Sequence, residues 1–322
     1  MLFVARAKQQ RHLSGNPAKR GSAEAPPPKP VTLGDWIGAA RLRTLPLGIA
    51  PVLIGTGAAV RADADHLFHW VIALTCLAVA VALQIGVNFA NDYSDGIRGT
   101  DDNRIGPARL TASGRVSPRA VLVAALIFFA IAAVAGLAIT IRTQQWWLIA
   151  VGAVCIIAAW FYTGGKRPYG YNALGEIFVF VFFGLVATLG TTWVQALSLP
   201  QEAWFGAVAA GFLACAVLLA NNLRDIDQDR VVGKRTLTVL IGRLGTKILY
   251  TVFVAFAFAI LVWMAFIAYP AAWIGLLSLL LLGPALVIVW TYGKPGELVP
   301  ALALTSLGSL AYAAILAFAF VI

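Results

Sequence analysis

Charged side chains are scarce in this chain, since Asp, Glu, Lys and Arg make up only 12% of its 322 residues. A soluble domain typically carries about 25% charged residues, because its surface must face water. Hydrophobic residues account for 60% of the sequence, and the mean hydropathy is +0.84. These values exclude an ordinary soluble domain and indicate an integral membrane protein.

Cysteine and histidine are also rare, with three residues of each. Cys76, Cys155 and Cys215 all fall inside apolar segments and show no paired spacing. We interpret them as small core residues rather than disulfide or metal partners. The three histidines lie in the N-terminal tail or in the loop after the first apolar segment. The residue types of a zinc or haem site are therefore missing from the parts of the chain where polar residues cluster.

Apolar runs recur along the chain at about the ~20 residues that cross ~30 Å of hydrocarbon. They predict an all-α membrane protein, a bundle of nine transmembrane helices at approximately 45–60, 69–90, 120–141, 145–163, 174–196, 203–222, 247–268, 271–292 and 298–321. The first of these is short and rich in Pro and Gly, which suggests an irregular or tilted span. A count of eight helices is therefore the alternative.

Basic residues are distributed unevenly between the two sides of the predicted membrane. All but two of the 24 Lys and Arg residues lie before the first span or in loops after even-numbered spans, and the exceptions are Arg61 and Arg142. The positive-inside rule then places the N-terminus and the active-site loops in the cytoplasm, with the chain multi-pass in the cell (inner) membrane. The net charge of +10 follows from topology and anionic lipid headgroups, so we expect a lipid bilayer and no nucleic acid as partner.

Residues 1–34 differ from the remainder in composition, with many basic, Gly, Ser and Pro residues and the stretch APPPKP. We expect a disordered basic cytoplasmic tail here, followed by a transmembrane domain at 35–322. The tail has no apolar core of a secretory signal. An organellar transit peptide is the alternative, because the start is rich in Arg and poor in acids.

Acidic residues cluster just after the second and sixth predicted spans. These two stretches hold seven of the 14 acids, namely Asp92, Asp95, Asp101, Asp102, Asp225, Asp227 and Asp229. If each helix continues beyond the apolar run, two polar strips form along helix faces, one of Gln84, Asn88, Asp92 and Asp95 and one of Asn222, Asp225 and Asp229. Each strip presents at least one amide and two carboxylates, which hints at a weak internal duplication.

Two such strips call for a cation, because stacked like charges repel and carboxylates near hydrocarbon are costly to desolvate. Carboxylate and amide oxygens suit Mg²⁺, which keeps several waters and is completed by substrate phosphates. We therefore predict a Mg²⁺ site formed by Asn88, Asp92, Asp95, Asn222, Asp225 and Asp229, with the four aspartates catalytic. The plainer interpretation is that the aspartates are solvated and pair with loop arginines. It fits any single aspartate better than it fits two parallel strips.

Four segments resemble, in the same order, the UbiA superfamily of intramembrane prenyltransferases. They are N-x-x-N-D-x-x-D at 88–95, RIGPARLTASGRVS at 104–117, YTGGKRPYGYNALGE at 162–176 and NNLRDIDQDRVVGKRTLTVLIG at 221–242. More narrowly, they resemble the branch that prenylates 1,4-dihydroxy-2-naphthoate for menaquinone synthesis. The resemblance runs from about residue 35 to the C-terminus.

The resemblance implies a nine-helix bundle around a central cavity, capped by cytoplasmic aspartate-rich loops. It also implies Mg²⁺-dependent transfer of a polyprenyl group from polyprenyl diphosphate to 1,4-dihydroxy-2-naphthoate, with loss of carbon dioxide. Many relatives carry a third acid at the position of Gly99. Because this chain has Asp101 and Asp102 instead, a metal-binding role for either of them stays open, as does one for Asp227.

Basic and aromatic residues in the same segments are further candidates. Arg104, Lys166 and Lys234 are predicted to bind the diphosphate. The candidates for binding the acceptor or stabilising an allylic cation are Arg43, Tyr93, Tyr162 and Arg167. The plainer interpretations are positive-inside charge for the bases and packing or interface contacts for the aromatic residues.

Three other functions account for part of this pattern. A related prenyltransferase that uses another acceptor, such as 4-hydroxybenzoate, differs only in its pocket. A CDP-alcohol phosphotransferase also uses membrane aspartates with a divalent metal, but its D-G-x-x-A-R signature is broken at residues 95–100. A cation-coupled transporter would also carry acids on related helices. Its carboxylates, however, are expected near the bilayer midplane rather than at helix ends.

Overall fold

The computed structural model of the chain describes residues 30–62, 70–100 and 109–322. Within these residues every regular element is helical, which confirms the predicted all-α fold. Residues Val31–Ile322 form one compact unit. The predicted tail lies outside the described residues as far as residue 29, and the first helix begins at Leu33.

The principal helices, in chain order, are α1 (Leu33–Ala39), α2 (Pro46–Ala62), α3 (Trp70–Ile97), α4 (Pro118–Thr143), α5 (Leu148–Phe161), α6 (Gly175–Val179), α7 (Ala187–Ala196), α8 (Gln201–Val231), α9 (Leu237–Ile267), α10 (Leu279–Thr291) and α11 (Leu298–Val321). Shorter segments are η2 (Leu42–Thr44), η3 (Tyr169–Tyr171), the π-helical η4 (Phe180–Val186), η5 (Pro270–Ser278) and η6 (Pro295–Glu297).

The described helices agree with the nine predicted spans. Seven are long and apolar enough to cross a membrane, α6, η4 and α7 counting as one, and the α1–η2 segment with α2 forms an eighth, bent by 48°. The shorter apolar helix α5 occupies the place of the remaining predicted span. The protein is therefore a multi-pass membrane protein.

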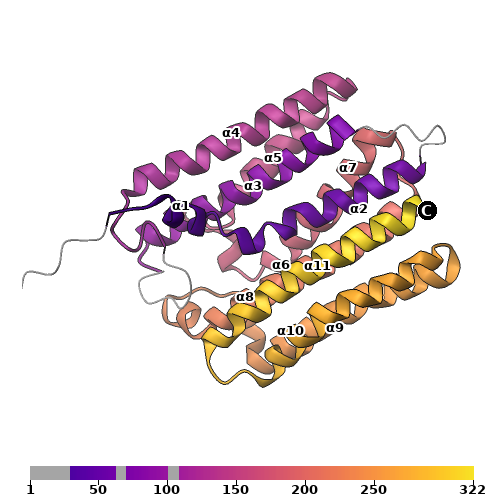
Figure 1. Cartoon of the computed structure of the whole chain (residues 1–322). Helices are drawn as coiled ribbons and strands as arrows, with labels where there is room; N and C mark the ends of the chain where they lie inside the picture. Colours follow the sequence, from indigo (N-terminus) through magenta and orange to yellow (C-terminus); the bar gives the residue numbers. More distant parts are fainter. Residues whose placement is uncertain (1–29, 63–69, 101–108) are drawn as a thin grey trace, which may run out of the picture. The chain divides into compact units, whose positions relative to one another are not determined.

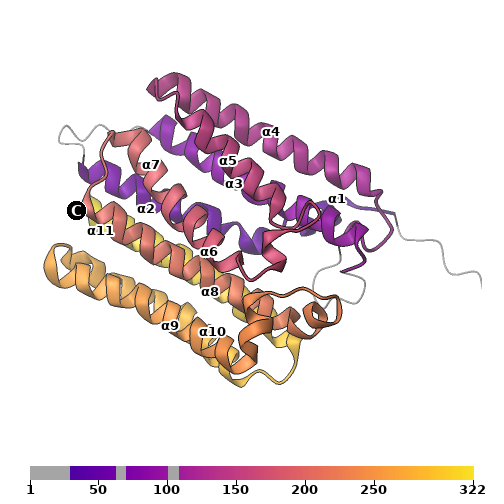
Figure 2. The ribbon, with the colours of Figure 1, turned by 180° about the vertical axis from the view of Figure 1, so that it is seen from behind.

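The glycines of the first predicted span serve helix packing. Helix α2 is continuous and packs against α7 and α11 (Figures 1 and 2). A Cβ at Gly55 would lie 2.5 Å from the carbonyl oxygen of Thr188, and one at Gly57 would lie 2.7 Å from the Cα of Ala317. Small residues at such positions let helix backbones approach closely in a membrane. The Gly-rich composition thus reflects close packing of α2 against its neighbours.

Helices α3 and α8 both extend beyond the predicted spans, which end at residues 90 and 222. Each helix is longer than predicted by about two turns or more at 3.6 residues per turn. The aspartates of the two motifs that the structure describes consequently lie on the last helical turns, not in the loops that follow. Hydropathy marks only the apolar part of a helix. The polar turns are stabilised by contacts with other segments.

Candidate active site

A cavity of about 370 Å³ lies inside the bundle, lined by α3, α5, α8 and the helix formed by α6, η4 and α7. Its lining on α3 extends from Cys76 to Asp95, about 28 Å of helix at 1.5 Å per residue. That length is close to the ~30 Å thickness of the hydrocarbon layer. The Asp95 end is polar and the rest is lined mainly by apolar residues. The cavity therefore provides one polar end and a long apolar passage.

The polar end brings together the two acidic motifs, which are far apart in the sequence. Five of the six predicted metal-binding residues line it, namely Asn88, Asp95, Asn222, Asp225 and Asp229. All five are at most 8% exposed. The catalytic residues predicted on the two motifs, Asp92 excepted, thus face one shared space.

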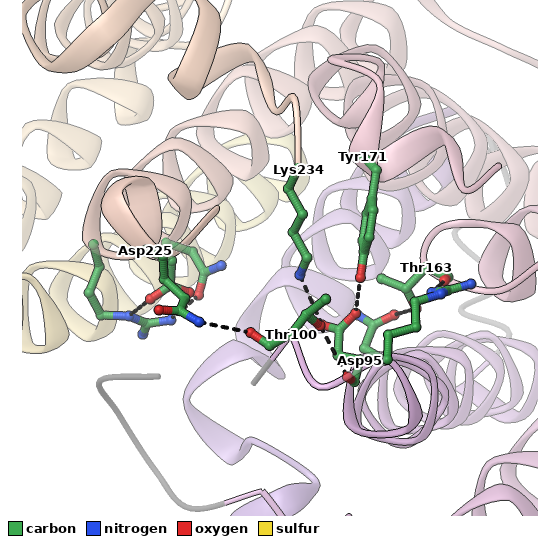
Figure 3. Close-up of polar contacts among 11 residues, drawn as sticks. Asp95, Thr100, Thr163, Tyr171, Asp225 and Lys234 are labelled. Atoms are coloured by element: carbon green, nitrogen blue, oxygen red, sulfur yellow. Dashed lines mark hydrogen bonds and ion pairs between the residues drawn. The ribbon is translucent and has the colours of Figure 1, made fainter. Parts of the chain in front are cut away.

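Asp95 is bound by two side chains from other segments (Figure 3). Oδ1 accepts a hydrogen bond from the Tyr171 hydroxyl at 2.5 Å, and Oδ2 lies 3.2 Å from Nζ of Lys234. The Lys234 ammonium also lies 4.5 Å from the centroid of the Tyr171 ring. Burial raises the pKa of Tyr171, and the Asp95 carboxylate raises it further. The hydroxyl therefore stays protonated and donates to Asp95.

Asp225 is held by its neighbour in the chain. Nε and one terminal nitrogen of Arg224 each donate to a carboxylate oxygen of Asp225 at 2.7 Å, and the same terminal nitrogen lies 2.9 Å from Oδ1 of Asn221. Arg224 and Asp225 are both buried. A two-pronged guanidinium contact of this kind orients the carboxylate as well as neutralising its charge.

The donor set fits Mg²⁺ with a diphosphate. Carboxylate and amide oxygens are the ligands that this ion prefers, and it usually takes only one or two carboxylates, with phosphates and water completing its shell. Over residues 30–62, 70–100 and 109–322, no three His, Cys, Asp or Glu side chains are close enough to hold a metal ion by themselves. The arrangement therefore suits an ion whose shell is completed by phosphate and water.

Asp92 does not line the cavity. It is fully buried, and its two oxygens accept hydrogen bonds from the backbone N–H groups of Leu110 and Thr111, each at 2.9 Å. At about 100° per residue, Asn91 lies closer than Asp92 to the helix face that carries Asp95. Asn91 does line the cavity, and its Oδ1 accepts from the Thr163 hydroxyl at 2.7 Å. The strip on α3 therefore includes Asn91, which the sequence prediction had missed.

Only some of the predicted basic residues line the cavity. Lys234 lines the cavity, whereas Arg43, Lys166 and Arg167 are exposed and lie outside its lining. Arg104 lies outside the described residues. Two arginines that the sequence prediction had missed, Arg41 and Arg109, line the cavity instead. Arg41 has a left-handed backbone conformation with φ of 54°, a conformation that sequence periodicity cannot reveal.

Of the aromatic candidates, too, only some line the cavity. Tyr162 lines the cavity and makes an edge contact with Tyr169, with 5.5 Å between the ring centroids. Tyr93 lies outside the lining and packs against Trp160 at 6.3 Å between centroids. Tyr171 was also missed, although it lies in the YTGGKRPYGYNALGE segment on which the family resemblance depends.

Comparison with known proteins identifies the family. The model of the UbiA prenyltransferase family matches residues 49–304. The chain is 49% identical over 288 residues to the 1,4-dihydroxy-2-naphthoate octaprenyltransferase of Mycobacterium tuberculosis, covering 88% of this chain and 95% of that protein.

Two solved structures have the same fold. A UbiA homolog from Aeropyrum pernix K1, in its apo form, has a TM-score of 0.65 at 17% identity, covering 84% of this chain and 96% of that one. A UbiA homolog from Archaeoglobus fulgidus bound to GPP and Mg²⁺ has a TM-score of 0.60 at 16% identity, covering 89% of this chain and 99% of that one. By its sequence and by its fold, this chain belongs to the UbiA prenyltransferase family.

Proposed function

We propose that this protein transfers a polyprenyl group from polyprenyl diphosphate to 1,4-dihydroxy-2-naphthoate, with loss of carbon dioxide, in menaquinone biosynthesis. The observation that carries the proposal is the single cavity that joins the acids of α3 and α8 to a long apolar passage. The polar end suits a diphosphate and the passage suits a polyprenyl chain. The 49% identity to a 1,4-dihydroxy-2-naphthoate octaprenyltransferase supports the choice of acceptor.

Mg²⁺ is the proposed cofactor. Asp95, Asp225 and Asp229 would hold it, and Asn222 lines the same cavity. When bound there, the ion offsets the negative charge that the leaving diphosphate gains as the carbon–oxygen bond breaks. The Archaeoglobus fulgidus homolog bound to GPP and Mg²⁺ supports this choice of ion.

Basic side chains at the polar end would bind the diphosphate directly. Lys234 and Arg109 both line the cavity, and charged hydrogen bonds to phosphate oxygens are stronger than neutral ones. Lys234 would exchange its contact with Asp95 for one with a phosphate oxygen. The site would thus present positive charge where the leaving group departs.

The remaining walls would protect the allylic cation. The passage is mainly apolar, so water that would capture the cation is excluded. The rings of Tyr162 and Tyr171 face the cavity near its polar end, where aromatic faces stabilise a cation. The electron-rich naphthalene ring then forms the new carbon–carbon bond, and its carboxylate leaves as carbon dioxide.

The proposed location is the cell (inner) membrane, with the polar end of the cavity in the cytoplasm. The uneven distribution of Lys and Arg between the two sides supports this orientation. Polyprenyl diphosphate fits it, because the diphosphate stays in water while the polyprenyl chain enters hydrocarbon.

Product analysis tests this function. Purified protein in detergent is given a polyprenyl diphosphate and Mg²⁺ with either 1,4-dihydroxy-2-naphthoate or 4-hydroxybenzoate, and the products are identified by mass spectrometry. We expect a prenylated naphthalenediol that lacks the carboxylate, formed only in the absence of a chelator of divalent ions. Transfer to 4-hydroxybenzoate alone would contradict the acceptor, and turnover in the presence of the chelator would contradict the role of Mg²⁺.

A further inference from the structure

A short chain of hydrogen bonds fixes the side chain of Gln84 on the cavity wall. Nε2 of Gln84 donates to Oγ1 of Thr44 at 3.1 Å, and the Thr44 hydroxyl donates to the backbone carbonyl of Arg41 at 2.9 Å. A threonine hydroxyl has a single hydrogen. Because that hydrogen is directed to Arg41, Oγ1 can only accept from Gln84. The NH₂ group of Gln84 faces Thr44, and Oε1 faces away from it.

Oε1 of Gln84 is a buried acceptor without a hydrogen-bond partner in the part of the chain that the structure describes. The residue is 6% exposed and lines the cavity. Leaving a buried carbonyl unpaired costs about 1 to 3 kcal/mol. This atom therefore favours a ligand that brings an N–H or O–H donor into the cavity.

The position of Gln84 along α3 indicates which substrate could donate a hydrogen bond to Oε1. Thr44 Oγ1 also accepts from the amide of Asn88 at 3.3 Å, so the Gln84 amide lies beside Asn88. Asn88 is about 10 Å along the helix from Asp95 at 1.5 Å per residue. The diphosphate belongs at the Asp95 end and carries no N–H donor, and the polyprenyl chain has no donor at all. The hydroxylated aromatic acceptor does carry O–H donors.

We propose that Gln84, held by Thr44, forms the subsite for the aromatic acceptor, and that its Oε1 accepts a hydrogen bond from a ring hydroxyl. This inference rests on the proposed function, because it takes the acceptor to be a hydroxylated aromatic ring. Arg41 lines the same cavity and supplies a positive charge for the ring carboxylate. The subsite selects for hydroxylated rings, because a ring without that hydroxyl leaves Oε1 unpaired.

Substitution of Gln84 with leucine tests the subsite. The change Gln84→Leu removes the acceptor atom and leaves the bond between Asn88 and Thr44 in place. The measurement is equilibrium binding of 1,4-dihydroxy-2-naphthoate by quenching of tryptophan fluorescence, without Mg²⁺ or diphosphate. We expect binding to weaken about tenfold, in keeping with the loss of one hydrogen bond. The Michaelis constant for the polyprenyl diphosphate should stay unchanged.

Acceptor analogues show whether the effect comes from a hydroxyl group. Two monohydroxy-2-naphthoates, one lacking the 1-hydroxyl and one lacking the 4-hydroxyl, are measured with wild type and with Gln84→Leu. We expect one of them to bind wild type about tenfold more weakly than the dihydroxy compound and to bind Gln84→Leu as it binds wild type. If the loss of binding from Gln84→Leu and the loss from removing a ring hydroxyl are additive for both analogues, no ring hydroxyl contacts Gln84 and the proposal is overturned.

Gln195→Leu is the matched control. Gln195 is 8% exposed, its Nε2 donates to Oγ1 of Thr56 at 3.0 Å, and it lies outside the cavity lining. It should leave binding of the naphthoate unchanged. Thr44→Val, which frees the Gln84 amide but retains its oxygen, should weaken binding in the same direction as Gln84→Leu.

The outcomes separate this inference from the proposed function. If wild type binds the naphthoate and Gln84→Leu binds it equally well, the subsite is wrong and the proposed function stands. If wild type binds only 4-hydroxybenzoate, the proposed acceptor fails, and a tenfold loss for that ring in Gln84→Leu would still support the subsite. Binding of neither ring by wild type would overturn both.

Discussion

The ammonium of Lys234 lies 3.2 Å from Oδ2 of Asp95, so a residue that follows α8 neutralises a carboxylate on α3. Both side chains are largely buried, at 12% and 5% exposure. The pair therefore joins the two acidic motifs directly. It also places a cation next to the space proposed for the diphosphate.

Replacing Lys234 with methionine should destabilise the protein when Mg²⁺ is absent. The change leaves the Asp95 carboxylate buried without its ion pair, which costs on the order of 3 kcal/mol. Mg²⁺ should restore part of this loss, because it supplies the missing positive charge. The measurement is loss of helical circular dichroism on heating in detergent, with and without Mg²⁺.

Arg243→Met provides the comparison for this prediction. Arg243 and Asp227 also form an ion pair, at 2.5 Å, but their side chains are 50% and 60% exposed. Exposed pairs contribute about 0 to 1 kcal/mol, so this variant should resemble wild type. Equal losses in both variants would show that the Lys234 pair is not a special feature of the site.

Asp92 and Asp95 should respond differently to substitution by asparagine. Asp95→Asn removes a proposed ligand, so we expect the Mg²⁺ concentration for half-maximal activity to rise about tenfold, since one charged contact is worth about 1.4 kcal/mol or more. Asp92→Asn weakens the contact with Leu110 and Thr111. Its activity should fall, with an unchanged Mg²⁺ requirement.

Gly96→Ala should reproduce the effect of Asp92→Asn by a different route. A Cβ at position 96 would lie 2.4 Å from the Cβ of Thr111, so the added methyl group displaces the same segment. Arg109, which lines the cavity, immediately precedes that segment. A raised Mg²⁺ requirement in Asp92→Asn would instead favour the original prediction that Asp92 binds the metal.

The apolar passage should determine which polyprenyl chains are accepted. Gly152 on α5 and Gly190 on α7 line the cavity, and a Cβ added at either would meet no atom within 4 Å. Leucine at either position would project into the passage without opposing helix formation, because leucine is a better helix former than glycine. In competition between geranyl and octaprenyl diphosphate, each variant should favour the short chain at least tenfold more than wild type does.

Gly283→Leu controls for adding a large side chain to an apolar helix. Gly283 on α10 also has no atom within 4 Å of its Cβ position, and it lies outside the cavity lining. This variant should retain the wild-type preference. If Gly152→Leu and Gly190→Leu also retain it, the polyprenyl chain does not occupy the passage beside these two glycines.

Cysteine labelling tests the proposed orientation. Lys294→Cys lies in the exposed loop between α10 and α11, and Ser198→Cys lies in the exposed loop between α7 and α8. In intact cells, a membrane-impermeant maleimide should label the Ser198 variant, whereas Lys294→Cys should require membrane disruption. The reverse result would invert the topology. Wild type measures the background from the native cysteines.

Much of this protein could be predicted from the sequence, because the relevant signals are local. Apolar runs determine the spans, and the helical period places Asp95 and Asn88 on one face of α3. The bias of Lys and Arg predicts the orientation. These features depend on residue type and spacing along a single helix, and the family motifs predicted the prenyltransferase fold that the comparisons confirm.

The choice between neighbouring residues depended on the tertiary structure. Asn91 faces the cavity and Asp92 faces the loop at Leu110, although both fit an extended polar helix end. Arg41, which has a left-handed backbone conformation, lines the cavity, and Arg43 does not. Sequence determines which residues share a helix face. Only the packing of distant segments decides which of those faces meet the cavity, and which polar groups are already bound by a neighbouring backbone.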